Sequence, residues 1–221
     1  MVKILMLILA SDTNDEYLAF QNEWLKYMNL APANIDCYFY KGDPHSSEKV
    51  KINYFTNTIT VSIEDTYANI YEKTLRVFEY FYPILSSYDF IFRTNLSSFI
   101  RFDKYIQLAK TFPKENFCSA IIGGDNKIKF PSGAGFTITP DIVKRLCDER
   151  PPYIVMDDVS IGYALQNWKI SIYQSYRYDI KENDQIETFQ TDHFHFRLKT
   201  NNRSQDVINY KKLVKKYYEL D

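Results

Sequence analysis

The sequence predicts a single α/β domain with a mostly parallel central sheet that helices cover on both faces. The 221 residues suit one domain with a sizeable core. Short apolar segments alternate along the chain with longer segments of helical periodicity, the pattern of a sheet covered by helices. No repeat, low-complexity tract or linker interrupts this alternation, so residues 1–221 are predicted to form one unit.

The first half of the chain predicts five strands and two helices. Residues 2–10 are apolar on both faces, which is typical of a central parallel strand. The segment S-D-T-N-D then supplies N-cap side chains for a helix over residues 16–28, where aromatic residues from Tyr17 to Tyr27 recur at helical spacing. The other elements expected here are strands at 35–40, 50–54, 58–63 and 90–92 and the longest helix at 65–85.

The second half continues the alternation of strands and helices. Glycines 123 and 124 end one predicted strand, and the segment S-G-A-G interrupts the next. The expected strands lie at 118–123, 130–138, 170–173 and 194–198, and the expected helices at 102–109, 140–147, 158–168 and 204–220.

Composition and charge exclude several classes of protein. The net charge is −1, which gives no electrostatic reason to expect binding to nucleic acid or to a membrane surface. The cysteines, Cys37, Cys118 and Cys147, are odd in number and far apart, which argues against a disulfide framework and fits a reducing compartment. The apolar run Ile4–Ala10 is too short to span a bilayer. We therefore expect a soluble, cytoplasmic protein without stable membrane insertion.

Three segments at or near predicted strand ends mark a candidate ligand site. They are Ala10-Ser11-Asp12, the run Arg93-Thr94-Asn95-Leu96-Ser97, and Ser132-Gly133-Ala134-Gly135. Ligands of such sheets bind beyond the carboxyl ends of the strands. Without a Cβ, the two glycines would let the backbone approach a ligand closely, although a β-bulge at a sheet edge is the alternative interpretation.

Three sequence motifs resemble those of one enzyme family. D-T-Y-A-N-I-Y-E-K-T at residues 65–74 resembles the D-S-Y-x-N-L-T-x-K-T signature of the beta-1,3-glycosyltransferases, the galactosyltransferase and Fringe-like enzymes. F-P-S-G-A-G-F at 130–136 resembles the family's Y-P-x-Y-x-S-G-x-G-Y, and M-D-D-V-S-I-G at 156–162 resembles its E-D-V-x-x-G. The three motifs occur in the family's order within residues 57–163.

The resemblance implies a Rossmann-like GT-A fold and transfer of a hexose from a nucleotide sugar, a UDP-sugar first of all, to a hydroxyl of a glycan acceptor. Within the family, the chain resembles a short, free-standing member of the bacterial or large-virus type, or one domain of a longer chain. Another α/β nucleotide-binding enzyme, such as a nucleotidyltransferase, is the weaker alternative, because the chain has neither a P-loop nor G-x-G-x-x-G.

The resemblance also implies roles for individual residues. The acidic pair Asp157 and Asp158 would supply the base of an inverting transferase; Asp158 aligns with the D of E-D-V, and Asp157 stays an alternative. From the residues alone, one of the pair could cap a helix while the other faces a cleft, or both could cap. Asn69 and Lys73, one helical turn apart, would face the donor diphosphate, unless they lie on a solvated helix face.

The chain departs from the family at its metal-binding motif. The family's D-x-D, whose carboxylates hold a divalent cation, is replaced here by Asn95-Leu96-Ser97, whose oxygens are neutral. In the late segment D-H-F-H-F-R-L-K, His193, His195 and Arg197 would share one strand face, where an imidazole could serve a metal or a diphosphate.

Three alternatives follow from this departure. Mn²⁺ or Mg²⁺ binds weakly through Asn95, Ser97, a late histidine and the donor diphosphate. Catalysis is metal-independent, with Arg93, Lys73 and Arg197 neutralising the diphosphate. Or catalysis has been lost, which leaves a module that binds a nucleotide sugar or a glycan.

Overall fold

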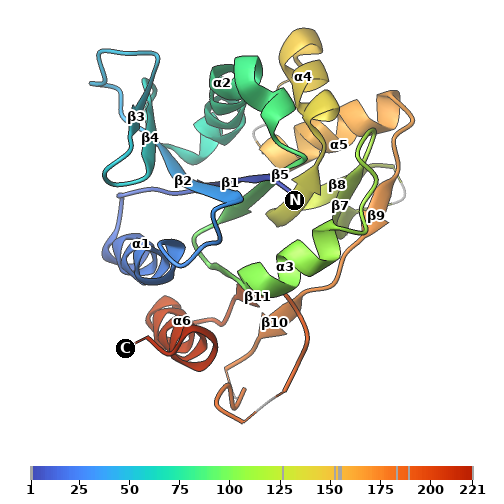
Figure 1. Ribbon diagram of the computed structural model, residues 1–221. Helices are drawn as coiled ribbons and strands as arrows, with labels where there is room; N and C mark the ends of the chain where they lie inside the picture. The colour runs from blue at the N-terminus through green and yellow to red at the C-terminus, as the bar shows by residue number, and fades with distance from the viewer. Residues whose placement is uncertain are drawn as a thin grey trace.

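The computed structural model describes residues 2–125, 127–151, 153, 156–182, 184–188 and 190–220, which fold around an eight-stranded sheet (Figure 1). In spatial order the strands are β3 (Val50–Asn53), β4 (Thr58–Val61), β2 (Ile35–Gly42), β1 (Ile4–Leu9), β5 (Phe90–Asn95), β8 (Lys129–Ile138), β7 (Cys118–Gly124) and β9 (Ile172–Gln174). Four neighbouring strands, in the order β4-β2-β1-β5, run parallel, whereas β8 runs antiparallel to both β5 and β7. The predicted α/β sheet is confirmed, and it is parallel around β1 and mixed beyond β5.

Helices cover both faces of the sheet, as predicted. Helices α2 (Ile70–Phe81), α4 (Pro140–Glu149) and α5 (Asp157–Asn167) lie on one face, and α1 (Asp15–Met28), α3 (Phe102–Ala109) and α6 (Arg203–Tyr218) on the other (Figure 1). The helix predicted at 65–85 is divided: the 3-10 turns η1 (Tyr67–Asn69) and η2 (Tyr82–Ser87) flank α2. Pro83 sits at the start of η2, where its missing N–H ends the α-helical ladder.

Strand β1 shows why the sheet sits at the centre of the molecule. The side chains of residues 4–8 alternate between two apolar cores, and each of these five residues is at most 1% exposed. Ile4, Met6 and Ile8 belong to the core beneath α1, α3 and α6, whereas Leu5 and Leu7 belong to the core beneath α2, α4 and α5. A strand apolar on both faces is thus buried on both faces, as the sequence predicted.

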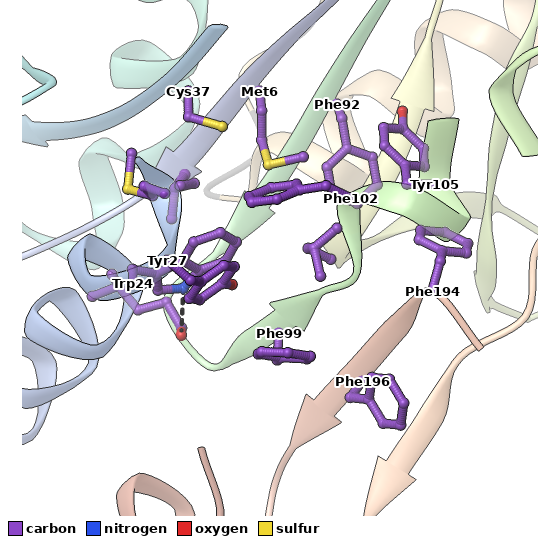
Figure 2. Close-up of a cluster of buried hydrophobic side chains, with 14 of the residues drawn as sticks. Met6, Trp24, Tyr27, Cys37, Phe92, Phe99, Phe102, Tyr105, Phe194 and Phe196 are labelled. Atoms are coloured by element: carbon purple, nitrogen blue, oxygen red, sulfur yellow. Dashed lines mark hydrogen bonds between the residues drawn. The ribbon is translucent and has the colours of Figure 1, made fainter. Parts of the chain in front are cut away.

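The core beneath α1, α3 and α6 is rich in aromatic rings (Figure 2). Trp24 stacks on Tyr27 with the ring centroids 5.1 Å apart, and the Tyr27 hydroxyl lies 2.8 Å from that of Tyr210 on α6. The indole N–H of Trp24 donates to the carbonyl of Leu96, at 3.0 Å. This core therefore fixes the loop that directly follows β5.

A second, three-stranded sheet lies beside this core. It consists of β6 (Ser98–Ile100), β10 (Tyr178–Ile180) and β11 (His195–Leu198), with β11 antiparallel to β6 and parallel to β10. The register sets Arg197 opposite Ser98, three residues after the end of β5. The pairing of β11 with β6 thus brings a late segment of the chain to the end of the central sheet.

Among the described residues, no helix combines the length and the apolar character that crossing a membrane requires.

Candidate active site

Two hollows open where β1 and β5 end, and together they form the strand-end cleft. The β1 hollow has a volume of about 430 Å³ and the Asp158 hollow about 440 Å³. Both are lined by Leu9, Tyr67, Ile70, Asn95 and Arg197, so they adjoin each other. A cleft thus lies at the strand ends where we expected a ligand site.

Most of the residues that the sequence singled out line this cleft. Those in the β1 hollow are Ala10, Ser11, Lys73 and Ser97, those in the Asp158 hollow are Arg93, Gly133, Asp157 and Asp158, and Asn95 and Arg197 line both. Asp12, Asn69, Thr94, Gly135, His193 and His195 are not among the described residues that line either hollow.

Asp157 is the centre of a buried polar network. Its carboxylate accepts hydrogen bonds from Arg93 Nη2, at 2.8 and 3.0 Å, and from the Thr74 hydroxyl, at 2.9 Å. Tyr40 completes the ring, because its hydroxyl accepts from Arg93 Nε at 3.1 Å and lies 3.0 Å from that of Thr74. The side chains of Arg93 and Asp157 are each 3% exposed. Asp157 is therefore committed to an internal ion pair.

Asp158 faces the cleft and is held by the backbone. Its Oδ2 accepts from the N–H of Gly133 at 2.8 Å, and its Oδ1 accepts from the N–H of Val159 at 2.8 Å. Burial and the charge of Asp157 raise the pKa of Asp158, while Arg93 and the two backbone N–H groups oppose the rise. A fixed carboxylate with a raised pKa has the properties that a general base needs.

The two glycines of S-G-A-G give room to side chains of the protein. A Cβ on Gly133 would lie 2.8 Å from Asp158 Oδ2 and 3.1 Å from Arg93 Nη1. A Cβ on Gly135 would lie 2.6 Å from Cε1 of His195. At these two positions the missing Cβ thus gives room to Asp158 and His195, and close approach of the backbone to a ligand stays a prediction.

Asn95 is directed toward a cation that the protein itself provides. Its Oδ1 accepts from Arg197 Nη1 at 2.6 Å, and the hydroxyls of Ser97 and Ser98 lie 3.3 and 3.2 Å from it. Asn95 Nδ2 donates to the carbonyl of Gly133 at 3.3 Å. Thr94 is fully buried and donates to the carbonyl of Ala134 at 2.7 Å, so it supports the site without lining it.

The two late histidines are not among the described residues that line the strand-end cleft. His193 precedes β11, contacts the Thr191 hydroxyl, and lines a different hollow together with Lys104 and Tyr176. His195 is 2% exposed, and burial, with the charges of Arg177 and Arg197, lowers its pKa well below the usual value. Its Nε2 has no hydrogen-bond partner among the described residues. Of the four tentative metal ligands, only Asn95 and Ser97 are among the described residues that line the strand-end cleft.

Three more of the predicted donor-binding residues, Asn69, Lys73 and Asp12, have partners within the protein. Asn69 lies in η1 and donates to the carbonyl of Glu64, whereas Lys73 is 3% exposed and forms an ion pair with Asp65. Lys73 lines the β1 hollow and Asn69 does not, so the expectation that the two together face a diphosphate stays a prediction. Asp12 is exposed and pairs with Lys41.

Cations surround the cleft, and several were not anticipated from the sequence. Arg177 and Lys199 line the Asp158 hollow, and Arg203 lines the β1 hollow. Lys199 lies two residues beyond Arg197, so the predicted strand pattern could have found it; nothing local marks Arg177. Four of the cleft cations have acidic partners: the pairs are Lys73–Asp65, Arg93–Asp157, Arg177–Asp179 and Arg203–Asp206.

Comparison with known proteins identifies the fold. No protein-family model matches the sequence, and no curated protein matches it. One solved structure that is similar is that of a glycosyltransferase involved in the glycosylation of the major capsid of PBCV-1, with a TM-score of 0.53 and 10% sequence identity. The similarity covers 95% of this chain and 98% of that chain. It supports the GT-A-like architecture, while membership of the Fringe-like family stays a prediction.

Proposed function

We propose that this protein is a glycosyltransferase that moves a hexose from a nucleotide sugar, a UDP-sugar first of all, to a hydroxyl of a glycan acceptor with inversion at the anomeric carbon. The observation that carries the proposal is Asp158: a carboxylate with a raised pKa, fixed by two backbone hydrogen bonds in a cleft rich in cations. The similarity in fold to a glycosyltransferase supports it.

In the proposed reaction, Asp158 acts as the general base. Its carboxylate takes the proton of the acceptor hydroxyl while that oxygen attacks the anomeric carbon. The bond between the anomeric carbon and the diphosphate oxygen breaks, and its electron pair leaves with the nucleoside diphosphate. Positive side chains in the cleft stabilise the charge that develops on this leaving group.

Asp157 has a different part in this proposal. Its oxygens already accept from Arg93 and Thr74, and its side chain is 3% exposed, so an acceptor hydroxyl has little access to it. The Arg93 guanidinium compensates the charge of Asp157 next to Asp158. Asp157 and Arg93 are therefore positioning residues, which hold Asp158 and Gly133 in place.

The residues expected to hold Mn²⁺ or Mg²⁺ do not fit such an ion. The Asn95 oxygen accepts from a guanidinium, and neither late histidine lines the strand-end cleft. The described residues also contain no cluster of three or more His, Cys, Asp or Glu that could hold a metal. The proposed reaction therefore has no step that depends on a divalent cation.

One observation favours a second function, a non-catalytic module that binds a nucleotide sugar or a glycan. Asn95 and Ser97 stand where the resembled family has carboxylates. A protein that had lost catalysis could keep the cleft and its cations while no longer transferring sugar. The raised pKa of Asp158 speaks for the enzyme, because a binding module has no need of a base.

The test is transfer by the purified protein. It is incubated with UDP-glucose or UDP-galactose and an oligosaccharide mixture, and new glycosides are detected by mass spectrometry. Wild type and Asp103→Asn, which removes an exposed carboxylate on α3, are expected to form product, and Asp158→Asn is expected not to. Donor binding without transfer by the wild type would favour the binding module. Absence of both would overturn the nucleotide-sugar proposal.

A further inference from the structure

Among the described residues, Arg197 differs from most of the cations around it in having no ion-pair partner. Lys73, Arg93, Arg177 and Arg203 all form ion pairs with carboxylates. Within the described part of the chain, Arg197 forms none, and its hydrogen-bond partner is the neutral amide of Asn95. The cleft thus contains a guanidinium without an ion-pair partner in the described chain, and the charge of Asp179 only partly offsets its burial and the cations around it.

This charge lies in an unfavourable environment in the absence of a ligand. Burial and the nearby cations Arg177 and Arg203 lower the pKa of Arg197 to about 10. An unpaired, largely buried charge is costly, and an anion placed beside it would relieve that cost. Lys199, exposed and also without an ion pair among the described residues, lines the same Asp158 hollow and adds positive charge there.

The position of Arg197 shows what kind of anion it would meet. Its Nη1 lies 2.6 Å from Asn95 Oδ1, at the end of β5, where the resembled family places the first carboxylate of its metal site. Arg197 also lines both hollows, so an anion beside it would lie between the β1 hollow and Asp158. A guanidinium presents a planar fork of N–H donors that matches phosphate oxygens.

We propose that Arg197, oriented by Asn95, takes the place of the divalent cation and binds the diphosphate of the donor, so that donor binding and transfer proceed without a metal. This inference rests on the proposed function, because it assigns the cation that meets the leaving group of that reaction. When the bond to the anomeric carbon breaks, the negative charge gained by the diphosphate oxygen lies against the guanidinium, and the proton of the acceptor goes to Asp158.

Calorimetric titration of the full chain with UDP and with inorganic pyrophosphate tests the proposal. Affinities are measured in EDTA and in Mn²⁺, and the two are expected to agree within about twofold. Arg197→Gln is expected to weaken both ligands by about tenfold or more, because a desolvated charge partner is removed. Arg197→Lys should fall in between, since it keeps the charge and loses the fork. The matched control is Arg145→Gln, which removes an exposed arginine of α4 and should change little.

A second variant keeps Arg197 and changes its partner. Asn95→Asp sets a carboxylate beside the guanidinium, which would neutralise it internally. The proposal predicts weaker binding of UDP in EDTA. A protein that bound its donor through a metal would gain a ligand from the same change and bind UDP more tightly in Mn²⁺. Circular dichroism of each variant checks that it is folded.

The outcomes separate this inference from the proposed function. Any one of three results would overturn the role of Arg197. These are wild-type binding that requires Mn²⁺, unchanged affinity in Arg197→Gln, and binding of UDP by Asn95→Asp in EDTA that is as tight as that of wild type or tighter. Metal-free binding that depends on Arg197, without transfer from any nucleotide sugar, would support the inference and overturn the catalytic function. Failure of both UDP and pyrophosphate to bind under either condition would overturn both.

Discussion

Replacing Arg93 by methionine should destabilise the protein strongly, because it leaves the Asp157 carboxylate buried without its cation. Both side chains are 3% exposed, and Arg93 Nη2 lies 2.8 Å from Asp157 Oδ2. Removing one partner of such a buried pair costs about 3–5 kcal/mol. An entropy of unfolding of about 2.1 cal/mol/K per residue, over the whole chain, converts this into a fall in Tm of about 6–11 °C.

The assay is calorimetric or circular-dichroism melting at pH 7, combined with urea unfolding. The comparison that isolates the ion pair is the double variant Arg93→Met with Asp157→Asn, in which neither charge remains. Neutralising both members of a buried pair is much less costly than removing one, so the double variant should recover at least half of the loss. Single variants of both residues complete the cycle.

Two results would refute this reasoning. A loss below about 1 kcal/mol in Arg93→Met, the size of an exposed ion pair, would mean that the pair contributes little to stability. A double variant as unstable as the sum of the two single variants would mean that the loss comes from the other contacts of Arg93, with Tyr40 and the carbonyl of Gly133.

Four further predictions concern Asp158 and its surroundings. Because only its carboxylate accepts a proton, the rate of transfer should rise as pH rises through its raised pKa, and a pH–rate profile without this limb would contradict the base. A raised pKa in the folded state means that the ionised Asp158 carboxylate lowers stability once the pH exceeds that pKa. The Tm of Asp158→Asn at pH 7 should therefore not fall below that of wild type by more than about 3 °C. Gly133→Ala should lower the rate of transfer by about tenfold or more by displacing Asp158, whereas Gly135→Ala, which meets His195, should lower Tm more than the rate; equal rates in the two variants would contradict this. Tyr40→Phe should cost about 1–3 kcal/mol in urea unfolding, because Arg93 Nε loses its partner, and no measurable loss would show that another group accepts from it.

Long periodic segments made most of the fold predictable from the sequence. Phe102–Ala109 was predicted with the bounds that the structure shows, and the apolar run of β1 correctly indicated a strand buried on both faces. The strands β6 and β10 were missed, because three residues carry too little alternation to be recognised. The helix expected at 65–85 shortened to α2 between two 3-10 turns, which shows that an apolar stripe alone does not fix where a helix ends.

The candidate site was predictable in place but not in its contacts. The rule that ligands bind at strand ends located the cleft correctly. The contacts depend on pairings between distant segments: Arg197 reaches Asn95 only because β11 pairs with β6, and Arg93 reaches Asp157 across 64 residues of chain. Such contacts carry no local signal. The strand pattern set His195 beside Arg197, but only the structure shows that His195 is buried against Gly135.

A crystal structure of the protein with UDP, grown in EDTA, would test the proposed mechanism most directly. We expect the diphosphate in the strand-end cleft, with its oxygens within hydrogen-bond distance of Arg197 and its terminal phosphate on the side of Asp158. A diphosphate bound outside this cleft, or one that enters it only when Mn²⁺ is supplied and bridges it to the protein, would contradict the mechanism.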